Sequence, residues 1–141
     1  MDKITAILTC YRRPQNLKEQ VGALLRQTYP PDDIWVWKNA HPDNEGFDAS
    51  KIKGITASVD SSHNFKYHGR FALGLLTDAK YVAFFDDDTI PGKGWFENCI
   101  NTMNTHEGIL GGAGVILDSR TYDRPGFICP HTRVGWPSKN S

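Results

Sequence analysis

The sequence carries no excess of charge of either sign. Its 141 residues include 16 lysines and arginines and 16 aspartates and glutamates, so the formal net charge at neutral pH is zero. A chain without a net charge offers no bulk attraction to duplex DNA or to an anionic membrane. We therefore expect no nucleic-acid partner, and any charge that matters for function must be local.

Cysteine and long apolar runs are also scarce. The three cysteines, Cys10, Cys99 and Cys129, are far apart in the sequence and show no CxxC spacing. This argues against a disulfide framework and against a four-cysteine zinc site, and it favours free thiols in a reducing compartment. No segment approaches the ~18 apolar residues of a membrane span, and the amino terminus does not resemble a secretory leader. We expect one cytoplasmic domain without a membrane span.

Short β-type runs alternate with helical stripes along the chain. Apolar side chains recur at helical spacing at Leu17, Val21, Leu24 and Leu25, and again at Phe71, Ala72, Leu75 and Leu76. Strands are expected from residue 4 to about residue 10 or 11 and at residues 33–37, 54–59, 81–85 and 109–117. A first helix is expected to begin near residues 14–16 and to end before residue 29, a second to cover about residues 68–77, and a third to carry the apolar stripe of residues 95–103. This alternation predicts an α/β fold with a mostly parallel central sheet flanked by helices.

One of the expected strands ends on three carboxylates. The stretch YVAFFDDDTIP runs from Tyr81 to Pro91 and places Asp86, Asp87 and Asp88 directly after the apolar run. In an open α/β sheet, ligands bind outside the carboxyl ends of the strands. If the chain stays extended, Asp86 and Asp88 face the same side, with Cα atoms about 6 to 7 Å apart. The pattern therefore marks a candidate binding site.

Clustered carboxylates repel one another unless a cation or hydrogen-bond donors offset their charge. A divalent metal is the simplest offset, and a few hard oxygen ligands suit Mg²⁺ or Mn²⁺ that completes its shell with phosphate and water. The alternative is a structural turn, in which Asp88 and Thr89 cap the following helix and the other carboxylates are solvated. The triplet alone does not decide between these interpretations.

Three separate segments bear on that choice because they resemble the family 2 glycosyltransferases, whose nucleotide-binding half has the GT-A fold. The segment ITAILTCYRRPQNLKEQVGALLRQTYPPDDIWVW resembles that family's opening strand, first loop, first helix and second strand. The segment NFKYHGRFALGLLTDAKYVAFFDDDTIP resembles its acidic DxD-type strand with the helix before it, and GWFENCI and GGAGVIL resemble the segments after that strand. The likeness covers residues 4 to about 117 in the family's order.

The resemblance implies a role for each candidate site residue. Cys10, Tyr11 and Arg13 correspond to the loop that holds the donor nucleotide, and Arg70 to a basic residue that contacts it. Asp86 is implied near the ribose and the metal, Asp87 on the nucleotide side, and Asp88 as a ligand of Mn²⁺ or Mg²⁺. A tyrosine ring offers a face for a nucleobase, and arginines offer charged donors to phosphate. Taken singly, Tyr11 could instead be a packing residue and either arginine a surface charge.

The chain departs from the family at the end of the second expected strand. Where an acidic turn is usual, this sequence reads Lys38-Asn39-Ala40-His41, so Lys38 replaces the usual base-reading carboxylate. Asn39 can still donate or accept a hydrogen bond at a base edge. A UDP-sugar remains the favoured donor, on the resemblance alone.

The acceptor side is where the sequence says least. An inverting transfer needs a carboxylate base for the acceptor hydroxyl, and only Asp118 and Asp123 follow the matched region. We expect residues 1–117 to form the nucleotide-sugar-binding domain, and residues 118–141 to begin an incomplete acceptor-side region or an irregular tail.

The function expected is metal-dependent transfer of a sugar from a nucleoside-diphosphate donor to a carbohydrate hydroxyl, with weak turnover by this chain alone. Two alternatives remain, a non-catalytic nucleotide-sugar-binding module and, less favoured, a sugar nucleotidyltransferase, for which the first loop lacks a glycine-rich signature.

Overall fold

The computed structural model describes residues 2–106 and 108–111. It contains four strands, β1 (Ile4–Cys10), β2 (Asp33–Lys38), β3 (Ala57–Asp60) and β4 (Tyr81–Phe85). Three α-helices accompany them, α1 (Leu17–Leu25), α2 (His68–Gly74) and α3 (Trp95–Met103), with short 3₁₀ turns at Pro14–Asn16, Pro42–Asn44 and Ala49–Lys51. The chain divides into two compact units, Met1–Lys93 and Gly94–Ser141.

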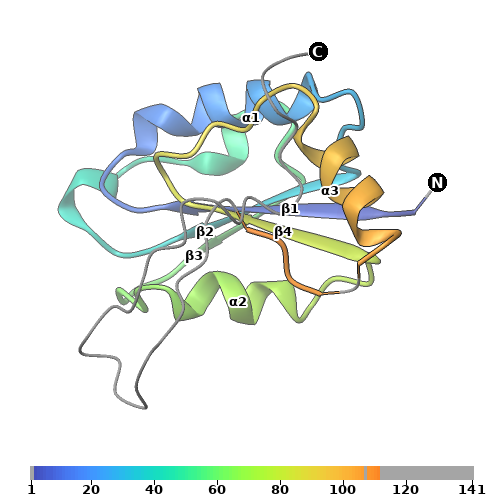
Figure 1. The fold of residues 1–141 in the computed structure, drawn as a ribbon. Helices are drawn as coiled ribbons and strands as arrows, with labels where there is room; N and C mark the ends of the chain where they lie inside the picture. The colour runs from blue at the N-terminus through green and yellow to red at the C-terminus, as the bar shows by residue number, and fades with distance from the viewer. Residues whose placement is uncertain (1, 107, 112–141) are drawn as a thin grey trace, which may run out of the picture. The chain divides into compact units, whose positions relative to one another are not determined.

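The first unit is a parallel sheet between helices, which confirms the expected fold class. The strand order is β3-β2-β1-β4, and every neighbouring pair is parallel. Helix α1 covers one face of the sheet and α2 covers the other (Figure 1). The register pairs Cys10 with Lys38 and Lys38 with Asp60, so these three strands end level with one another. The loops that follow the strands therefore meet at one edge.

The core lies around the central strand. Because β1 has a neighbour on each side and a helix over each face, its apolar side chains are buried, as are those of α1 and β2 that pack around them. Ile4, Ile7, Leu8, Leu17, Val21, Leu24, Ile34 and Val36 are at most 1% exposed. Burial of each such side chain stabilises the fold by roughly 1.5 to 3 kcal/mol. The mostly apolar run at residues 4–8, in which Thr5 is also 0% exposed, is thus explained by burial on both faces.

Helix α1 confirms the expected stripe except at its last position. Leu25 is 49% exposed, although it lies eight residues after the buried Leu17. At 100° per residue, a position eight residues along lies about 80° around the helix from the first, whereas one seven residues along is only about 20° away. Leu24 therefore faces the sheet, and Leu25 lies at the border of the buried face.

Helix α2 packs on the sheet by a different face from the one that the sequence predicts. Leu75 and Leu76 are 86% and 74% exposed, and the helix ends at Gly74 rather than at residue 77. Its buried positions are Gly69 and Leu73. The pairing of large apolar residues was misleading because the sheet surface under α2 is itself bulky.

Two aromatic side chains of the sheet fill the space under α2. A Cβ atom on Gly69 would lie 2.0 Å from the Trp37 ring of β2, and one on Gly74 would lie 2.7 Å from Phe84 of β4. Only glycine allows such a close approach of a helix backbone to an aromatic ring. The glycines therefore set the distance between α2 and the sheet.

The third strand is also shorter than the sequence predicts. The expected strand at residues 54–59 is observed at Ala57–Asp60. Gly54 has φ of +107°, and the amide of Ile55 donates to the Ile52 carbonyl at 3.2 Å, so a turn occupies the start of the expected range. A left-handed residue of this kind is incompatible with a strand.

The second unit contributes α3, which confirms a helix over the apolar stripe of residues 95–103, and within it the rings of Trp95 and Phe96 meet edge to face at 5.1 Å. The expected strand at residues 109–117 falls mostly outside the described residues, as does the expected domain boundary at residue 117. In the part of the chain that the structure describes, no helix is both long and apolar enough to cross a membrane.

Candidate functional site

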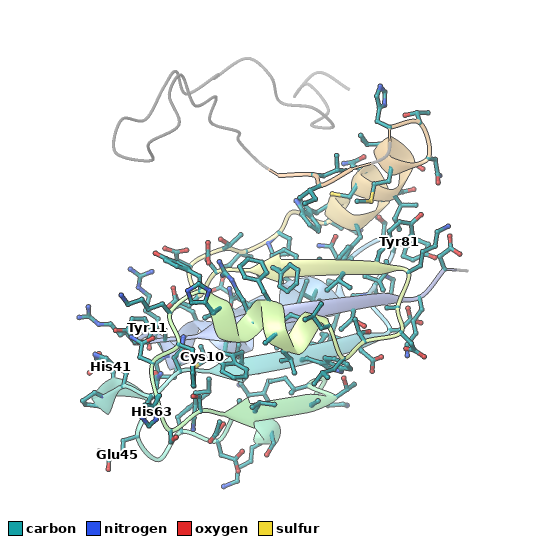
Figure 2. The ribbon with its side chains drawn as sticks, turned by 90° about the horizontal axis from the view of Figure 1, so that it is seen from below. Cys10, Tyr11, His41, Glu45, His63 and Tyr81 are labelled. Atoms are coloured by element: carbon teal, nitrogen blue, oxygen red, sulfur yellow. The ribbon has the colours of Figure 1, made fainter. Side chains whose placement is uncertain are left out.

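A pocket of about 470 Å³ opens at the edge where the strands end. It is lined by Thr9, Tyr11, Asn39, Asn64, Lys66, Tyr67, Arg70, Asp86, Asp87 and Asp88. These residues come from segments that are far apart in sequence. In Figure 2, Tyr11, His41 and His63 gather at this edge, whereas Tyr81, the first residue of β4, lies at the opposite end. The structure thus brings six of the eight predicted site residues into one pocket; Cys10 and Arg13 do not line it.

The three aspartates form a turn rather than an extended segment. The amide of Thr89 donates to the Asp86 carbonyl at 3.1 Å, which closes a hydrogen-bonded turn directly after β4. The expectation that Asp86 and Asp88 face one side and Asp87 the other rested on extended backbone. In the turn, Asp87 and Asp88 share one arginine while Asp86 binds another.

Arg70 of α2 is the partner of Asp86. Its Nη1 donates to Asp86 Oδ1 and, at 3.3 Å, to the hydroxyl of Thr9 at the end of β1. The Arg70 side chain is only 12% exposed, and its guanidinium lies 5.6 Å from the centre of the Tyr67 ring. Arg70 is therefore a fixed positive charge in the pocket wall, held by a carboxylate, a hydroxyl and an aromatic ring.

Arg13, from the loop after β1, is the partner of the other two aspartates. Its Nη1 donates to Asp88 Oδ2 at 2.8 Å and to Asp87 Oδ1 at 3.3 Å. The hydrogen bond to Asp88 raises the pKa of Arg13, so its charge is secure. Burial raises the pKa of Asp87, an effect that the Arg13 charge opposes. Since the side chains of Arg13 and Asp88 are 49% and 60% exposed, this pair can exchange partners without a large desolvation cost.

These arginines change the argument for a metal. The sequence interpretation assumed that the carboxylates lack an offset, but the structure supplies two guanidinium groups. Among residues 2–106 and 108–111, no group of three or more His, Cys, Asp or Glu side chains is arranged to hold a metal ion. The side chains of Asp86 and Asp88 are still 58% and 60% exposed and offer hard oxygen atoms. Such oxygen donors fit Mg²⁺ or Mn²⁺ only if other ligands complete the coordination shell.

Two amide side chains of the α1 segment hold the acidic turn by its backbone. Gln20 Nε2 donates to the Asp86 and Thr89 carbonyls at 2.6 and 2.8 Å, and Asn16 Nδ2 donates to the Asp87 carbonyl at 3.0 Å. Gln20 is 1% exposed. Because the contacts are to carbonyls, the carboxylates remain available for ligands. Neither residue carries a motif that marks it in the sequence; the one available signal is that the glutamine follows Leu17 by three residues, on the buried face of α1.

Asn39 has a structural role in addition to its place in the pocket wall. Its Oδ1 accepts from Trp37 Nε1 at 2.9 Å and from the Phe65 amide at 3.1 Å, and its Nδ2 donates to the Lys66 carbonyl at 3.0 Å. Asn39 is 2% exposed, and its second N–H makes no hydrogen bond within residues 2–106 and 108–111. Asn39 therefore ties the end of β2 to the loop at residues 61–67.

Tyr11 directly follows the last residue of β1, and its ring packs edge to face with that of His41, at 5.1 Å between ring centres. The loop that carries it is fixed by Asn44, whose side chain accepts from the Arg12 amide at 3.1 Å and donates to the Cys10 carbonyl at 3.3 Å. Arg12 has φ of +66°. One buried asparagine thus holds a left-handed turn beside the pocket.

The Cys10 side chain is buried rather than presented to the pocket. It is 1% exposed, and its Sγ lies 4.0 Å from Asn44 Oδ1. Burial raises the pKa of the Cys10 thiol to about 11. A ligand can therefore reach this position only through its backbone, and the thiol is neutral at physiological pH.

We expect Cys10 in the folded chain to react with iodoacetamide at pH 8 at least about 100-fold more slowly than in urea, because the thiolate is the reactive form. Since the folded pKa is raised from 9.0 to about 11, the associated stability is present below pH 9 and is lost as the pH rises through 11. Peptide mapping by mass spectrometry measures the modification. Equal rates with and without urea would show that the thiol is accessible.

The ammonium group of Lys38 already has partners, and it lies beside a second pocket. Its Nζ lies 2.6 Å from Asp60 Oδ2 and donates to the Phe47 carbonyl at 2.5 Å. Both Lys38 and Asp60 line a separate cavity of about 500 Å³ that also includes His41 and Glu45. The lysine that replaces the usual carboxylate is therefore paired with an aspartate from the next strand.

The chain matches the family model described as Glycosyl transferase family 2 over residues 5–134. No curated protein matches it in sequence. Among solved structures it is similar to S. aureus TarS 1-349 in complex with UDP-GlcNAc, with a TM-score of 0.60 and 15% identity, over 84% of this chain and 42% of that chain. The complex of TarS 1-349 with UDP gives a TM-score of 0.60 and 15% identity, over 84% and 43%.

Full-length S. aureus TarS gives the same TM-score of 0.60 at 14% identity, over 84% of this chain and 26% of that chain. The chain therefore spans less than half the length of these TarS structures. At this level of identity the likeness concerns the fold, which is that of a GT-A glycosyltransferase.

Proposed function

Because the chain belongs to glycosyl transferase family 2, we propose that it binds a nucleoside-diphosphate sugar in the pocket at the carboxyl edge and transfers the sugar to a carbohydrate hydroxyl. The observation that carries this proposal is the convergence of Tyr11, Arg70 and the aspartates of the acidic turn on one pocket of about 470 Å³. Pockets of this size suit small-molecule ligands. A UDP-sugar is the proposed donor, and the TarS complexes with UDP-GlcNAc and UDP support that choice.

Each side chain then has a task. The nucleobase lies against the exposed side of the Tyr11 ring, and the free N–H of Asn39 meets its edge. Asp86 lies near the ribose. Arg70 keeps a positive charge in the wall of the pocket, and Arg13 turns from the exposed Asp88 to the diphosphate, since a guanidinium binds phosphate oxygens as readily as carboxylate oxygens.

Asp88, with Asp86 beside it, would hold Mn²⁺ or Mg²⁺. Such an ion, when bound, supplies charge stabilisation for the departing diphosphate. Asn16 and Gln20 contribute by fixing the turn, because their bonds to its carbonyls hold the carboxylates in place before a ligand arrives. Inversion at the anomeric carbon is part of the proposal, and its base is unassigned because Asp118 and Asp123 lie outside the described residues.

A non-catalytic nucleotide-sugar-binding module is the second candidate, since it would use the same donor pocket. Acceptor-dependent formation of glycosylated product separates the two functions. A cytoplasmic location remains a prediction from the scattered cysteines, of which Cys10 and Cys99 are free.

The first test is a thermal-shift series with UDP, GDP, dTDP and CMP, each with and without Mn²⁺. A ligand that binds only the folded state at about 100 times its Kd adds about 2.7 kcal/mol to the free energy of unfolding, which shifts Tm by several degrees in a small domain. We expect UDP with Mn²⁺ to give the largest shift. If none of the four nucleotides raises Tm at millimolar concentration, the proposal fails.

A further inference from the structure

Lys66 is a cation in the wall of the pocket. It lies in the loop between β3 and α2 and lines the same cavity as Tyr11 and Arg70. Lys66 takes part in none of the ion pairs found among residues 2–106 and 108–111. The two arginines of the site, in contrast, are both bound to carboxylates. The charge of Lys66 is therefore available to a ligand without exchange of partners.

The backbone of Lys66 is held in an uncommon conformation. Its φ is +52°, in the left-handed region that residues other than glycine rarely occupy. Two asparagine side chains fix it there. The Lys66 amide donates to Asn64 Oδ1 at 2.9 Å, and the Lys66 carbonyl accepts from Asn39 Nδ2 at 3.0 Å. Local strain of this kind persists only where the surroundings impose it, and it is concentrated at binding sites.

We infer that Lys66 binds the diphosphate of the donor, an inference that rests on the proposed function. Three aspartates line the pocket against two cations, Arg70 and Lys66, so the formal charge of the lining is −1 with Lys66 and would be −2 without it. A ligand with two phosphates therefore meets less repulsion when Lys66 faces it. Lysine is a compact donor-only charge on a flexible stem, and such a group binds phosphate as a point charge. An uncharged nucleoside gains nothing comparable from it. The interaction should therefore depend on the phosphates.

The test compares UDP with uridine in the presence of EDTA, which removes any contribution from divalent metal. Lys66→Gly removes the charge while suiting the left-handed backbone, and Lys66→Arg keeps the charge. Lys53→Ala, at an exposed lysine outside the pocket, is the matched control. Titration calorimetry gives the Kd values, and thermal melting checks that each variant is folded.

We expect Lys66→Gly to weaken UDP binding about 10-fold, the low end of what a hydrogen bond to a charged group contributes, with uridine affinity within about 2-fold of the parent. Lys66→Arg should stay within about 3-fold for both ligands, and Lys53→Ala should match the parent. The UDP affinity of Lys66→Gly should also fall less steeply with added salt, because one ionic contact is gone.

Equal losses for UDP and uridine would show that Lys66 acts on the nucleoside, and that result overturns the inference. Unchanged UDP affinity in Lys66→Gly overturns it as well, while leaving the proposed function intact. A parent chain that binds UDP with Mn²⁺ but not with EDTA would show that the metal and not Lys66 holds the diphosphate, which overturns the inference and leaves the proposed function intact. If the parent chain binds no UDP even with Mn²⁺, the proposed donor is wrong and the assignment of Lys66 fails with it.

Discussion

Asp88→Asn should remove the part of UDP binding that depends on Mn²⁺. Even outer-shell partners of a metal contribute about 10- to 100-fold to metal affinity, so loss of a direct ligand should reduce the gain from Mn²⁺ by at least about 100-fold. Without metal, the variant should bind UDP at least as well as the parent does. In the parent, the Asp88 carboxylate accepts from Arg13 at 2.8 Å and so competes with the diphosphate for it, and Asp88→Asn removes that carboxylate. Calorimetric titration of UDP with Mn²⁺ and with EDTA measures both effects.

The control for this variant is Asp78→Asn. Asp78 is an exposed carboxylate that forms an ion pair with Lys3 and does not line the pocket. Asp78→Asn changes the net charge by the same amount as Asp88→Asn, so a general electrostatic effect would appear in both variants. An Asp88→Asn chain that gains as much affinity from Mn²⁺ as the parent would rule out Asp88 as a metal ligand.

Gly69→Ala should destabilise the chain by about 3 kcal/mol, the upper end of the usual cost of overpacking. The added Cβ would lie 2.0 to 2.3 Å from three atoms of the Trp37 indole, so the ring or the helix must move. The ring is not free to move, because its Nε1 donates to Asn39 at 2.9 Å. Urea denaturation followed by circular dichroism gives the difference in the free energy of unfolding.

Gly92→Ala is the matched control for Gly69→Ala, since a Cβ at Gly92 meets nothing within 4 Å. A second substitution tests the cause. With Trp37→Leu, the cost of Gly69→Ala should shrink by more than about 1 kcal/mol, because residues in contact are not additive. If Gly69→Ala alone, with Trp37 unchanged, reduced the free energy of unfolding by less than about 0.5 kcal/mol, α2 would be free to shift away from the sheet.

Most of the sheet could be predicted from the sequence because its central strands are buried on both faces. The compact, mostly apolar runs at residues 4–8 and 33–37 belong to the central strands β1 and β2, and the run at residues 81–85 is β4. The face of α2 could not be predicted, because periodicity scores large apolar residues. Here the buried positions of α2 are Gly69 and Leu73, and Trp37 and Phe84 of the strands fill the space at its glycines.

The site follows the same division. Tyr11, Arg70 and the aspartates stand at strand ends or in a recognisable motif, so their presence at one edge could be predicted. The ion pairs from Arg13 and Arg70 to the aspartates join residues far apart in the chain, and no local pattern encodes them. Gln20 and Lys66 were missed for a related reason. The one-letter sequence does not show whether a glutamine side chain is buried or whether the backbone of a lysine is left-handed. Both properties depend on the surrounding fold.

The position of β1 at the centre of the sheet affects how the chain assembles during synthesis. β1 is made first, yet its pairing with β4, from Ile4 with Tyr81 onward, must wait until the ribosome has delivered residues 81–85. Until then one edge of the most apolar strand has no partner, and unpaired strand edges favour association with other chains. Contacts between such distant segments also slow folding. The nascent chain thus keeps this edge of β1 exposed until just before the acidic turn emerges, and the residues that pair with it are followed at once by those that form the pocket.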